Sequence, residues 1–432
     1  MEKYSEYKDS GIQWIGEIPS HWEVKTLKRL ILHHKAGSWG EEPNSNLHNL
    51  ICLRIADFDY EKVCFQRKKQ YTIRSYKDSD IIDRVLFDGD ILIEKSGGGD
   101  KSPVGRAVYY DLGIHNCMYA NFMEKLVVTE AIEAKYLVYL LKTSYTNKVI
   151  WKYVKFTTGI QNLDLQSMLS NEKVPLPPLS EQERIVKFLE GKVLKIDEYI
   201  ADKEREIQLL KELKEAEIAK AVTQGLNPNV KMKDSGIPWI GMIPEHWETT
   251  KINSVFKERR EKVSDKIYPP LSVSKQGITP QLESAVKTDN GDNRKKVNEG
   301  DFVVNSRSDR KGSCGISPYT GSVSLINIVL QPRSDIEGKY FHFLFRSNNY
   351  IEEYYRIGRG IVADLWTTRY SEMRNIIVPI PPIGEQRTIV NYIDTKCSKV
   401  DSLITELEAE IEHLKEYKQR LIADCVTGQI KV

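Results

Sequence analysis

The sequence of 432 residues lacks the features that mark membrane, secreted and zinc-binding proteins. No apolar run approaches the roughly 18–20 residues that cross a membrane. The opening MEKYSEYKDSGIQW lacks the basic and apolar segments of a secretion signal. The six cysteines form no C-x-x-C pair and show no zinc spacing together with histidine. We therefore expect a cytoplasmic protein with reduced thiols, no bound metal and no contact with a membrane.

The sequence also lacks the motifs of common enzymes. It has no glycine-rich K-S/T loop for nucleotide phosphates and no Asn/Asp-Pro-Pro-aromatic motif of methyltransferases. The nearest nuclease-like string ends in Glu94 and Lys95, which are adjacent where such nucleases have a spacer between the acid and the lysine. The eight histidines show no H-E-x-x-H pattern. We expect a chain without catalytic residues, and a nuclease or methyltransferase with an unrecognised site is the alternative.

Two blocks of the sequence occur twice, in the same order. Lys8–Trp22 (KDSGIQWIGEIPSHW) is repeated at Lys233–Trp247 (KDSGIPWIGMIPEHW). Pro175–Val186 (PLPPLSEQERIV) is repeated at Pro379–Val390 (PIPPIGEQRTIV). Repetition at half-chain spacing indicates a duplicated structural unit. We expect two variable domains on one scaffold, with the Trp-rich motif packing each domain against the following helices; a duplication without functional divergence is the alternative.

A long amphipathic helix is predicted after each proline-rich block. Apolar residues recur at alternating spacings of three and four from Ile393 to Cys425, where only Lys418 interrupts the stripe, and a similar stripe starts at Leu189. A 3.5-residue repeat of this length favours a coiled coil. Ser180, three residues before Glu183, predicts a helix cap. We expect the two helices to pair antiparallel; packing of each helix on its own domain, or homo-oligomers, is the alternative.

The predicted fold class is α+β. Two globular mixed α/β domains are separated by a pair of long antiparallel coiled-coil helices, with an internal two-fold repeat. The predicted boundaries are residues 1–174 for the first domain, 175–225 for the first helix, 226–378 for the second domain and 379–432 for the second helix. Short β-like runs at Ile91–Ile93, Ala107–Tyr110 and Phe302–Val304, and helical stretches at Ala134–Tyr153 and Gly338–Tyr355, support mixed domains.

The net charge of +2 is small, but the charges are unevenly distributed. Lysine and arginine exceed aspartate and glutamate by 22 to 18 in Val24–Val174 and by 21 to 15 in Thr249–Val378. The balance is reversed in the predicted helices, at 9 to 11 in Glu181–Val222 and 6 to 9 in Glu385–Asp424. Because phosphates attract excess positive charge, we expect the two domains to bind nucleic acid and the helices to meet protein partners.

Clusters of basic and small polar residues are the candidate DNA contacts. Arginine can contact guanine through two hydrogen bonds, and lysine more often holds phosphates. A single basic residue is more often a solvated surface charge, so the clusters carry the prediction. The candidates in the first domain are Arg67, Lys68, Lys69, Lys95, Ser96, Lys101 and Arg106. The candidates in the second domain are Arg259, Arg260, Lys275, Arg294, Lys295, Lys296, Arg307, Arg310 and Lys311.

The whole chain resembles the DNA-specificity subunit of type I restriction–modification systems. The resemblance rests on the duplicated S-G-I-x-W-I-G-x-I-P-x-H-W opening, the duplicated P-x-P-P-[LI]-x-E-Q block, and the long helix that follows each second block. It implies two target-recognition domains, each recognising one half of a bipartite asymmetric site in double-stranded DNA. No base-contacting residue can be transferred from the family, because these domains are its least similar part.

The resemblance also implies a division of labour between subunits. The paired helices would set the number of unspecified base pairs between the half-sites and dock two methylation subunits, which use S-adenosylmethionine. Restriction subunits, which use ATP and Mg²⁺, would join this core. The specificity subunit itself would bind no cofactor directly and catalyse no reaction. A coiled-coil adaptor that does not bind DNA is a further alternative.

Overall fold

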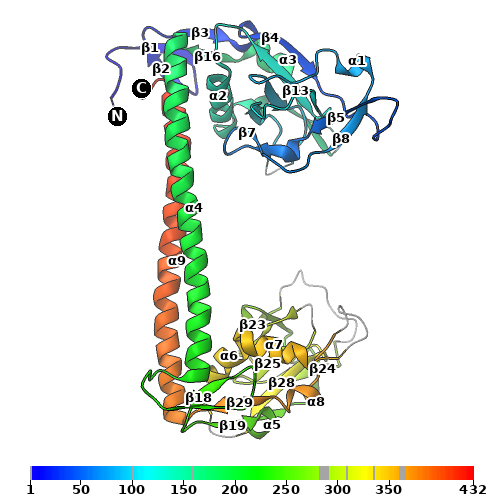
Figure 1. The fold of residues 1–432 in the computed structure, drawn as a ribbon, viewed down its shortest axis with the longest axis vertical. Helices are drawn as coiled ribbons and strands as arrows, with labels where there is room; N and C mark the ends of the chain where they lie inside the picture. The colour runs from blue at the N-terminus through cyan, green and yellow to red at the C-terminus, as the bar shows by residue number, and fades with distance from the viewer. Residues whose placement is uncertain are drawn as a thin grey trace. The chain divides into compact units, whose positions relative to one another are not determined.

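The computed structural model describes residues 2–99, 102–157, 159–281, 291–307, 310–333, 336–359 and 366–432 of the chain (Figure 1). The chain divides into two compact units. The first unit contains Met1–Asp202 and Glu410–Val432, and the second contains Lys203–Ala409. Each unit therefore combines one domain with part of each long helix. The described part of the chain contains no helix whose length and apolar character would suit it to spanning a membrane.

The two long helices are α4 (Leu179–Gln224) and α9 (Ile383–Val426), with 46 and 44 residues. At about 1.5 Å per residue, each is roughly 65–70 Å long. In the first unit the start of α4 pairs with the end of α9, and in the second unit the end of α4 pairs with the start of α9 (Figure 1). The predicted antiparallel pairing is therefore confirmed. Both helices also pack on the domain in each unit. Pairing of the helices and packing of the helices on the domains therefore occur together.

Both long helices begin directly after a proline, and the first begins before the residue that the sequence predicted to cap it. The carbonyl of Pro178 accepts hydrogen bonds from the N–H groups of Glu181 and Gln182, at 2.8 and 3.1 Å. Ser180 thus lies inside the first turn, and the predicted Ser180 cap is wrong. The second helix likewise begins at Ile383, directly after Pro382. The physical reason is that proline has the fixed φ of a helix entry and needs no N–H there.

The first unit is built on a four-stranded antiparallel sheet in the order β11-β9-β13-β4, covered by α2. Its strands are β4 (Ile31–Ala36), β9 (Ile91–Glu94), β11 (Ala107–Tyr109) and β13 (Met123–Val128). The other sheets and pairs contain β1 (Tyr7–Ile12), β2 (Gly16–Pro19), β3 (Glu23–Thr26), β5 (His48–Leu53), β6 (Phe58–Asp59), β7 (Cys64–Phe65), β8 (Ile73–Tyr76), β10 (Ser96–Gly97), β12 (Cys117–Tyr119), β14 (Val154–Thr157), β15 (Ile160–Leu163) and β16 (Lys173–Leu176). The helices are α1 (Asp78–Ile81), α2 (Ala134–Thr146), α3 (Leu165–Asn171) and the 3-10 turns η1 (Leu27–Arg29), η2 (Ile55–Asp57) and η3 (Ile150–Tyr153).

The second unit repeats this sheet as β26-β25-β28-β20. Its strands are β20 (Phe256–Glu258), β25 (Phe302–Asn305), β26 (Cys314–Ile316) and β28 (Asn327–Pro332). The remaining strands are β17 (Met232–Asp234), β18 (Met242–Pro244), β19 (Glu248–Lys251), β21 (Lys262–Val263), β22 (Leu271–Ser274), β23 (Gly277–Pro280), β24 (Arg294–Val297), β27 (Gly321–Val323) and β29 (Ile377–Ile380). The helices are α5 (Ile252–Val255), α6 (Gly338–Arg346), α7 (Asn348–Arg356) and α8 (Tyr370–Met373).

The four-stranded sheets are buried on both faces, which explains their continuous apolar strands. Successive side chains of a strand point to opposite faces of its sheet. In β9, Ile91 and Ile93 therefore join the core shared with α2 and the long helices, and Leu92 joins a separate core. In β25, Val303 likewise faces away from the core that contains Phe302. The predicted α+β fold with an internal repeat is confirmed by these matching sheets and cores.

The repeated tryptophan motif fastens each domain to the helix pair. Trp22 is fully buried, and its indole N–H donates to the Glu181 carboxylate at 3.2 Å. Trp247, also fully buried, donates to the Glu385 carboxylate at 3.0 Å. His21 lies 2.9 Å from the same Glu181 carboxylate, which supports a structural role for the motif's histidine. The predicted packing role of the motif is confirmed.

A buried tyrosine makes a second contact to the long helices in each unit. The Tyr136 hydroxyl donates to the carbonyl of Val426 near the end of α9, at 3.0 Å. The Tyr340 hydroxyl donates to the carbonyl of Val222 near the end of α4, at 2.7 Å. The last carbonyls of a helix have no partner within the helix, so these hydroxyls satisfy them. Each domain thus binds the beginning of one long helix and the end of the other.

Candidate nucleic-acid interface

The candidate residues of the first unit differ in their exposure and in their intramolecular partners. Lys68 contacts the buried carboxylate of Asp57 at 2.6 Å, and Lys95 contacts the buried Glu124 at 2.9 Å. The Ser96 hydroxyl lies 2.6 Å from the side-chain oxygen of Asn162. Arg67 and Lys69 are exposed. Lys101 lies outside the described residues.

Arg106 is partly exposed and is bound by an acidic partner within the first unit. Its guanidinium makes two hydrogen bonds to Glu94, at 2.8 and 2.5 Å, and only 2% of the Glu94 side chain is exposed. Hydrogen bonding to this carboxylate raises the pKa of Arg106. Glu94 was the nearest candidate for a nuclease acid, and its oxygens are occupied by Arg106. Among the described residues, no group of three or more His, Cys, Asp or Glu could hold a metal ion.

Several candidates of the second unit are engaged in ion pairs or buried. Arg259 binds Asp301 through two hydrogen bonds, at 2.7 and 3.1 Å. Arg294 is only 5% exposed and donates to the side chain and backbone of Ser322. The sequence placed Arg294 among the candidate DNA contacts, but its side chain is buried. The reason is that its β24 strand pairs with β27, so the side chain reaches inward to Ser322.

The remaining candidates of the second unit lie at or near its surface. Lys296 contacts Glu261 at 3.0 Å and lies over the Tyr268 ring. Lys311 contacts Glu352 at 2.5 Å and lies over the Tyr355 ring, 4.6 Å from its centroid. The exposed candidates are Arg260, Lys275, Arg307 and Arg310. The structure thus keeps most of the predicted cations accessible while assigning several of them intramolecular partners.

An open groove brings two of the candidates together in the second unit. Arg260 and Lys295 line it, on either side of Glu258, which they neutralise with contacts of 2.7 and 3.2 Å. The groove also contains two cations that the sequence did not single out, Lys262 and Arg369. We call the groove formed by these charged residues the basic groove. Its other lining residues are Ser306, Leu325, Ile326, Ile328, Thr367, Tyr370 and Ser371.

The basic groove combines four cations with one acid, which suits a polyanion such as the phosphate backbone. Lys262 and Arg369 come from segments more than a hundred residues apart in the sequence. No local charge cluster contains Arg369, so sequence reasoning had no signal that would group it with Lys262. A fold in which the two segments meet was needed to find it.

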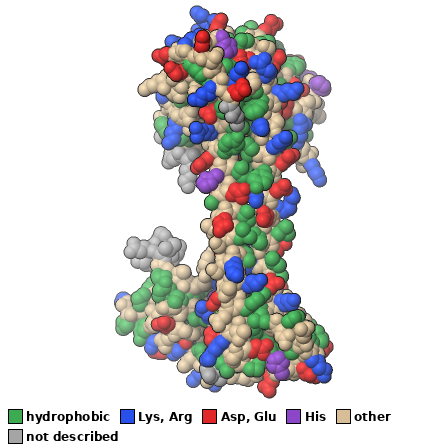
Figure 2. Space-filling view, turned by 90° about the vertical axis from the view of Figure 1, so that its left-hand side faces the viewer, with side chains coloured by type: hydrophobic (Ala, Val, Ile, Leu, Met, Phe, Trp, Pro, Cys, Tyr) green, Lys and Arg blue, Asp and Glu red, His purple; other side chains and the backbone are tan. Residues whose placement is uncertain are grey.

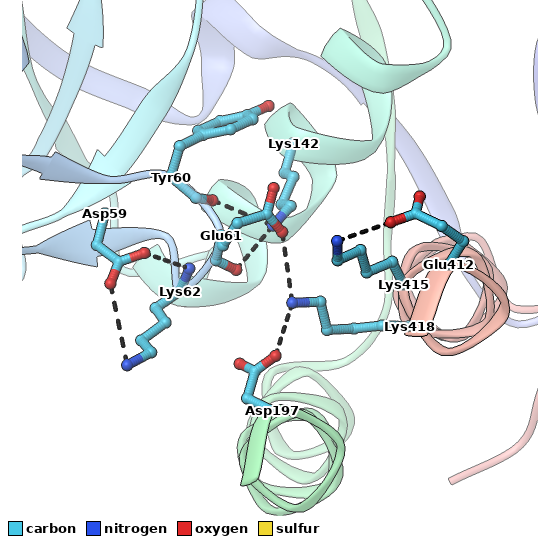
Figure 3. Close-up of polar contacts among 9 residues, drawn as sticks. All are labelled: Asp59, Tyr60, Glu61, Lys62, Lys142, Asp197, Glu412, Lys415 and Lys418. Atoms are coloured by element: carbon cyan, nitrogen blue, oxygen red, sulfur yellow. Dashed lines mark hydrogen bonds and ion pairs between the residues drawn. The ribbon is translucent and has the colours of Figure 1, made fainter. Parts of the chain in front are cut away.

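A different charged cluster in the first unit consists of side chains that contact one another (Figure 3). Lys418 of α9 is only 3% exposed and contacts Asp197 of α4 at 2.7 Å and Glu61 at 3.3 Å. Lys142 of α2 donates to the backbone carbonyls of Tyr60 and Glu61, at 3.1 and 2.8 Å. This polar cluster therefore joins the domain to both helices within the first unit.

The ionisation states in this cluster follow from burial and mutual charge. Burial lowers the pKa of Lys142, and the nearby Glu61 carboxylate opposes that shift. Burial of the Glu61 carboxyl opposes its ionisation, but Lys142 and Lys418 outweigh burial, so the pKa of Glu61 is lowered. The cluster holds an ionised carboxylate between two lysines. Its groups have partners within the first unit.

Comparison with protein families finds the same domain in both halves of the chain. A model of the type I restriction modification DNA specificity domain matches residues 59–209 and 244–413. A proposed MjaX specificity subunit of a type I restriction enzyme from Methanocaldococcus jannaschii is 27% identical over 433 residues, covering 97% of this chain and 96% of that protein. The specificity subunit of the EcoKI type I restriction enzyme from Escherichia coli K12 is 23% identical over 369 residues, covering 79% of this chain and 75% of that protein.

Solved structures share the fold over nearly the full chain. A chain from work on complex assembly and conformational transition of the type I R-M system superposes with a TM-score of 0.69 at 16% identity, covering 96% of this chain and 99% of that chain. The HsdS subunit from Thermoanaerobacter tengcongensis superposes with a TM-score of 0.54 at 16% identity, covering 96% of this chain and 98% of that chain. At these identities the likeness establishes a common fold.

Proposed function

The chain belongs to the type I restriction–modification DNA specificity family, and we propose from this premise that each of its two domains recognises one half of a bipartite, asymmetric DNA site. The chain is a DNA sequence-recognition subunit without catalysis of its own, and it works with DNA and with the modification and restriction subunits of its system. Within this proposal the chain acts in the cytoplasm, where its DNA target is.

One observation carries the proposal of two half-sites. The same four-stranded sheet and the same helix contacts occur in both units, yet the surface residues differ. After β9 the first unit has Lys95 beside Glu124. After the equivalent strand β25 the second unit has the basic groove, which contains Arg369. Two different surfaces on one frame suit two different base sequences, because base-specific contacts depend on side-chain chemistry.

The domain assignment is tested by exchanging domains. Residues Val24–Val174 are replaced by the corresponding segment of a family member with a known site, and the methylated sequence is determined in a host that carries the modification subunit. We expect one half of the site to change and the other half to stay. The reciprocal exchange of Thr249–Val378 is the matched control and changes the other half. A change of both halves in either chimera would refute the assignment.

The long helices are the proposed docking surface for two modification subunits. In the first unit Tyr199 and Tyr417 are 46% and 47% exposed, and in the second Leu213 and Leu403 are 54% and 40% exposed. Each pair takes one residue from α4 and one from α9. Figure 2 shows hydrophobic side chains among acidic and basic ones along the helices. Exposed apolar residues from both helices in each unit suit one partner copy in each unit.

The partner subunits supply the chemistry in this proposal. The chain binds no cofactor directly, and S-adenosylmethionine, ATP and Mg²⁺ are used by the modification and restriction subunits. Glu94 is the residue that most resembles a nuclease acid in the sequence. Its carboxylate oxygens accept hydrogen bonds from Arg106, which supports a chain without a metal-dependent site of its own. The purified chain incubated with DNA, Mg²⁺ and S-adenosylmethionine is therefore expected to show no turnover until the modification subunit is added.

The paired helices are also proposed to set the spacer between the half-sites. Both helices are continuous, so a heptad inserted into each lengthens the pair by about 10 Å, the rise of about three base pairs. We expect such a double insertion to lengthen the unspecified spacer of the methylated site without altering either half. A site with an unchanged spacer would contradict this part of the proposal.

A further inference from the structure

The turn that leads into the central strand of the sheet carries an exposed apolar side chain in both units. In the first unit Phe122 lies between β12 and β13 and is 46% exposed. In the second unit Leu325 and Ile326 lie between β27 and β28 and are 41% and 38% exposed. The turns occupy equivalent positions, because β13 and β28 pair with the equivalent strands β9 and β25.

Hydrogen bonds hold both turns in place. The Phe122 carbonyl accepts from the backbone N–H groups of Lys95 and Ser96, at 2.8 and 3.2 Å. The Ile326 carbonyl accepts from the Ser306 hydroxyl at 2.5 Å. Lys95 and Ser306 each directly follow the equivalent strand of their sheet, β9 or β25. The apolar side chains are therefore presented from fixed backbone, which reduces the entropy lost when a ligand covers them.

The surroundings of the second turn indicate a polyanionic ligand. Leu325 and Ile326 line the basic groove together with Arg260, Lys262 and Arg369. The single acid of the groove, Glu258, is already paired. An apolar contact flanked by excess positive charge matches a base beside its phosphates and does not match the apolar face of a protein helix.

The first turn has a smaller set of polar neighbours. Lys95 is partly exposed beside Phe122, and Ser96 pairs in β10 with Asn162 of β15. The β14–β15 hairpin adds the exposed side chains of Phe156 and Ile160, which are 74% and 48% exposed. Both turns thus combine a fixed apolar group with residues that can contact phosphates or base edges.

We propose that Phe122 in the first unit, and Leu325 and Ile326 in the second, contact bases of the respective half-sites and contribute to sequence specificity. The chemical match is the apolar edge of a base, of which the thymine 5-methyl group is the most apolar. The cations of the basic groove hold the adjacent phosphates. This inference rests on the proposed function, since it assigns base-contacting residues to the two recognition domains.

The test uses the full chain co-expressed with its modification subunit, and the methylated sites are sequenced. The variants are Phe122→Ser in the first unit and Ile326→Ser in the second. The matched controls are Phe87→Ser and Tyr319→Ser, which remove exposed aromatic side chains near the other end of β9 and β25. We expect Phe122→Ser to relax one position in one half-site, and Ile326→Ser one position in the other half-site, while both controls keep the wild-type site.

A variant that loses all methylation is resolved by binding measurements on the purified complex. The inference requires affinity for the cognate duplex to fall about tenfold or more, while affinity for a random duplex stays at the wild-type value. An equal loss on both duplexes would overturn it, as would an unchanged methylated site in both variants. Failure of the proposed function differs from these outcomes, because the wild-type chain would then direct no methylation of a two-part site.

Discussion

Lys418 of α9 lies 2.7 Å from Asp197 of α4 in the first unit, and its counterpart Lys214 of α4 lies 2.6 Å from Asp401 of α9 in the second. The two pairs occupy repeat-related positions, but only the first is buried. The Lys418 side chain is 4% exposed and the Lys214 side chain is 27% exposed. Glu61 accounts for the difference, because it covers Lys418 and contributes a second carboxylate.

The first prediction concerns the free energy of unfolding. Lys418→Ala leaves the Asp197 carboxylate without its buried partner, so we expect the first unit to lose about 3 kcal/mol of stability. The equivalent change Lys214→Ala removes a more exposed pair and is expected to cost at most about 1 kcal/mol. Denaturant unfolding of both variants measures the difference. Equal losses would show that burial by Glu61 does not strengthen the first pair.

The second prediction concerns the dependence of stability on pH. Burial lowers the pKa of His342 from 6.5 to about 4 in the folded second unit. The unfolded chain therefore binds the proton more strongly, so stability falls as pH drops from about 6.5 towards 4. His342→Gln is expected to reduce the loss between pH 6.5 and pH 5 by on the order of 1–2 kcal/mol. Thermal unfolding at both pH values checks this; identical pH profiles for wild type and variant would contradict it.

The third prediction concerns the buried tyrosines. Tyr340→Phe removes the hydroxyl that donates to the Val222 carbonyl and leaves that carbonyl unsatisfied in the core. We expect a loss of about 1–2 kcal/mol in the free energy of unfolding. Tyr319→Phe, at an exposed tyrosine of the same unit, is the control and should leave the stability within about 0.5 kcal/mol of wild type. A loss in the control of the same size would refute the assigned role of the buried hydroxyl.

The fourth prediction concerns assembly. Aspartate at Leu213 and Leu403 together places two charges among the exposed apolar residues of the helices in the second unit, so we expect fewer modification subunits to co-purify with the variant chain. Leu32→Asp, at a residue of β4 that is 68% exposed, is the control and should retain the wild-type ratio. The measurement is the subunit ratio by light scattering. A full complement of modification subunits on the double variant would exclude this docking surface.

The fifth prediction concerns the salt dependence of DNA binding. If Arg369 neutralises one phosphate, Arg369→Ala lowers the slope of log affinity against log salt concentration by about 1. Lys339→Ala removes a similar charge from α6, where Lys339 contacts Asp394 at 3.2 Å, and should leave the slope unchanged. Titrations of the assembled complex at several salt concentrations give both slopes. The same slope for Arg369→Ala and wild type would remove this residue from the interface.

The features that could be predicted from the sequence are those that repeat along it. The repeated proline-rich block and the spacing of apolar residues together predict both long helices to within two residues at each end, because proline ends the preceding structure and a helix buries a stripe of fixed period. The sequence runs at Ile91–Ile93 and Phe302–Val304 correspond to β9 and β25. The helical stretch predicted at Ala134–Tyr153 is instead α2 followed by the 3-10 turn η3, with Asn147 at the end of α2.

The candidate interface was less predictable, since it depends on residues that are distant in the sequence. Clusters of cations are visible in a sequence, but their partners are not. Arg294 and Lys295 are adjacent, yet Arg294 is buried against Ser322 and Lys295 lines the basic groove. Arg369 belongs to no cluster and still reaches that groove. Local composition could not separate these cases, because strand pairing decides which side chain faces outward.

By itself the sequence determined the duplication and the two long helices, because repeats and periodic apolar residues are local properties that one chain can display directly. Only the tertiary structure decided which charges are buried, which lie in the basic groove, and that Phe122 and Ile326 lie exposed at equivalent turns. The physical reason is that burial and charge pairing are set by contacts between segments far apart in the chain. The spacing of residues along one segment carries no information about those contacts.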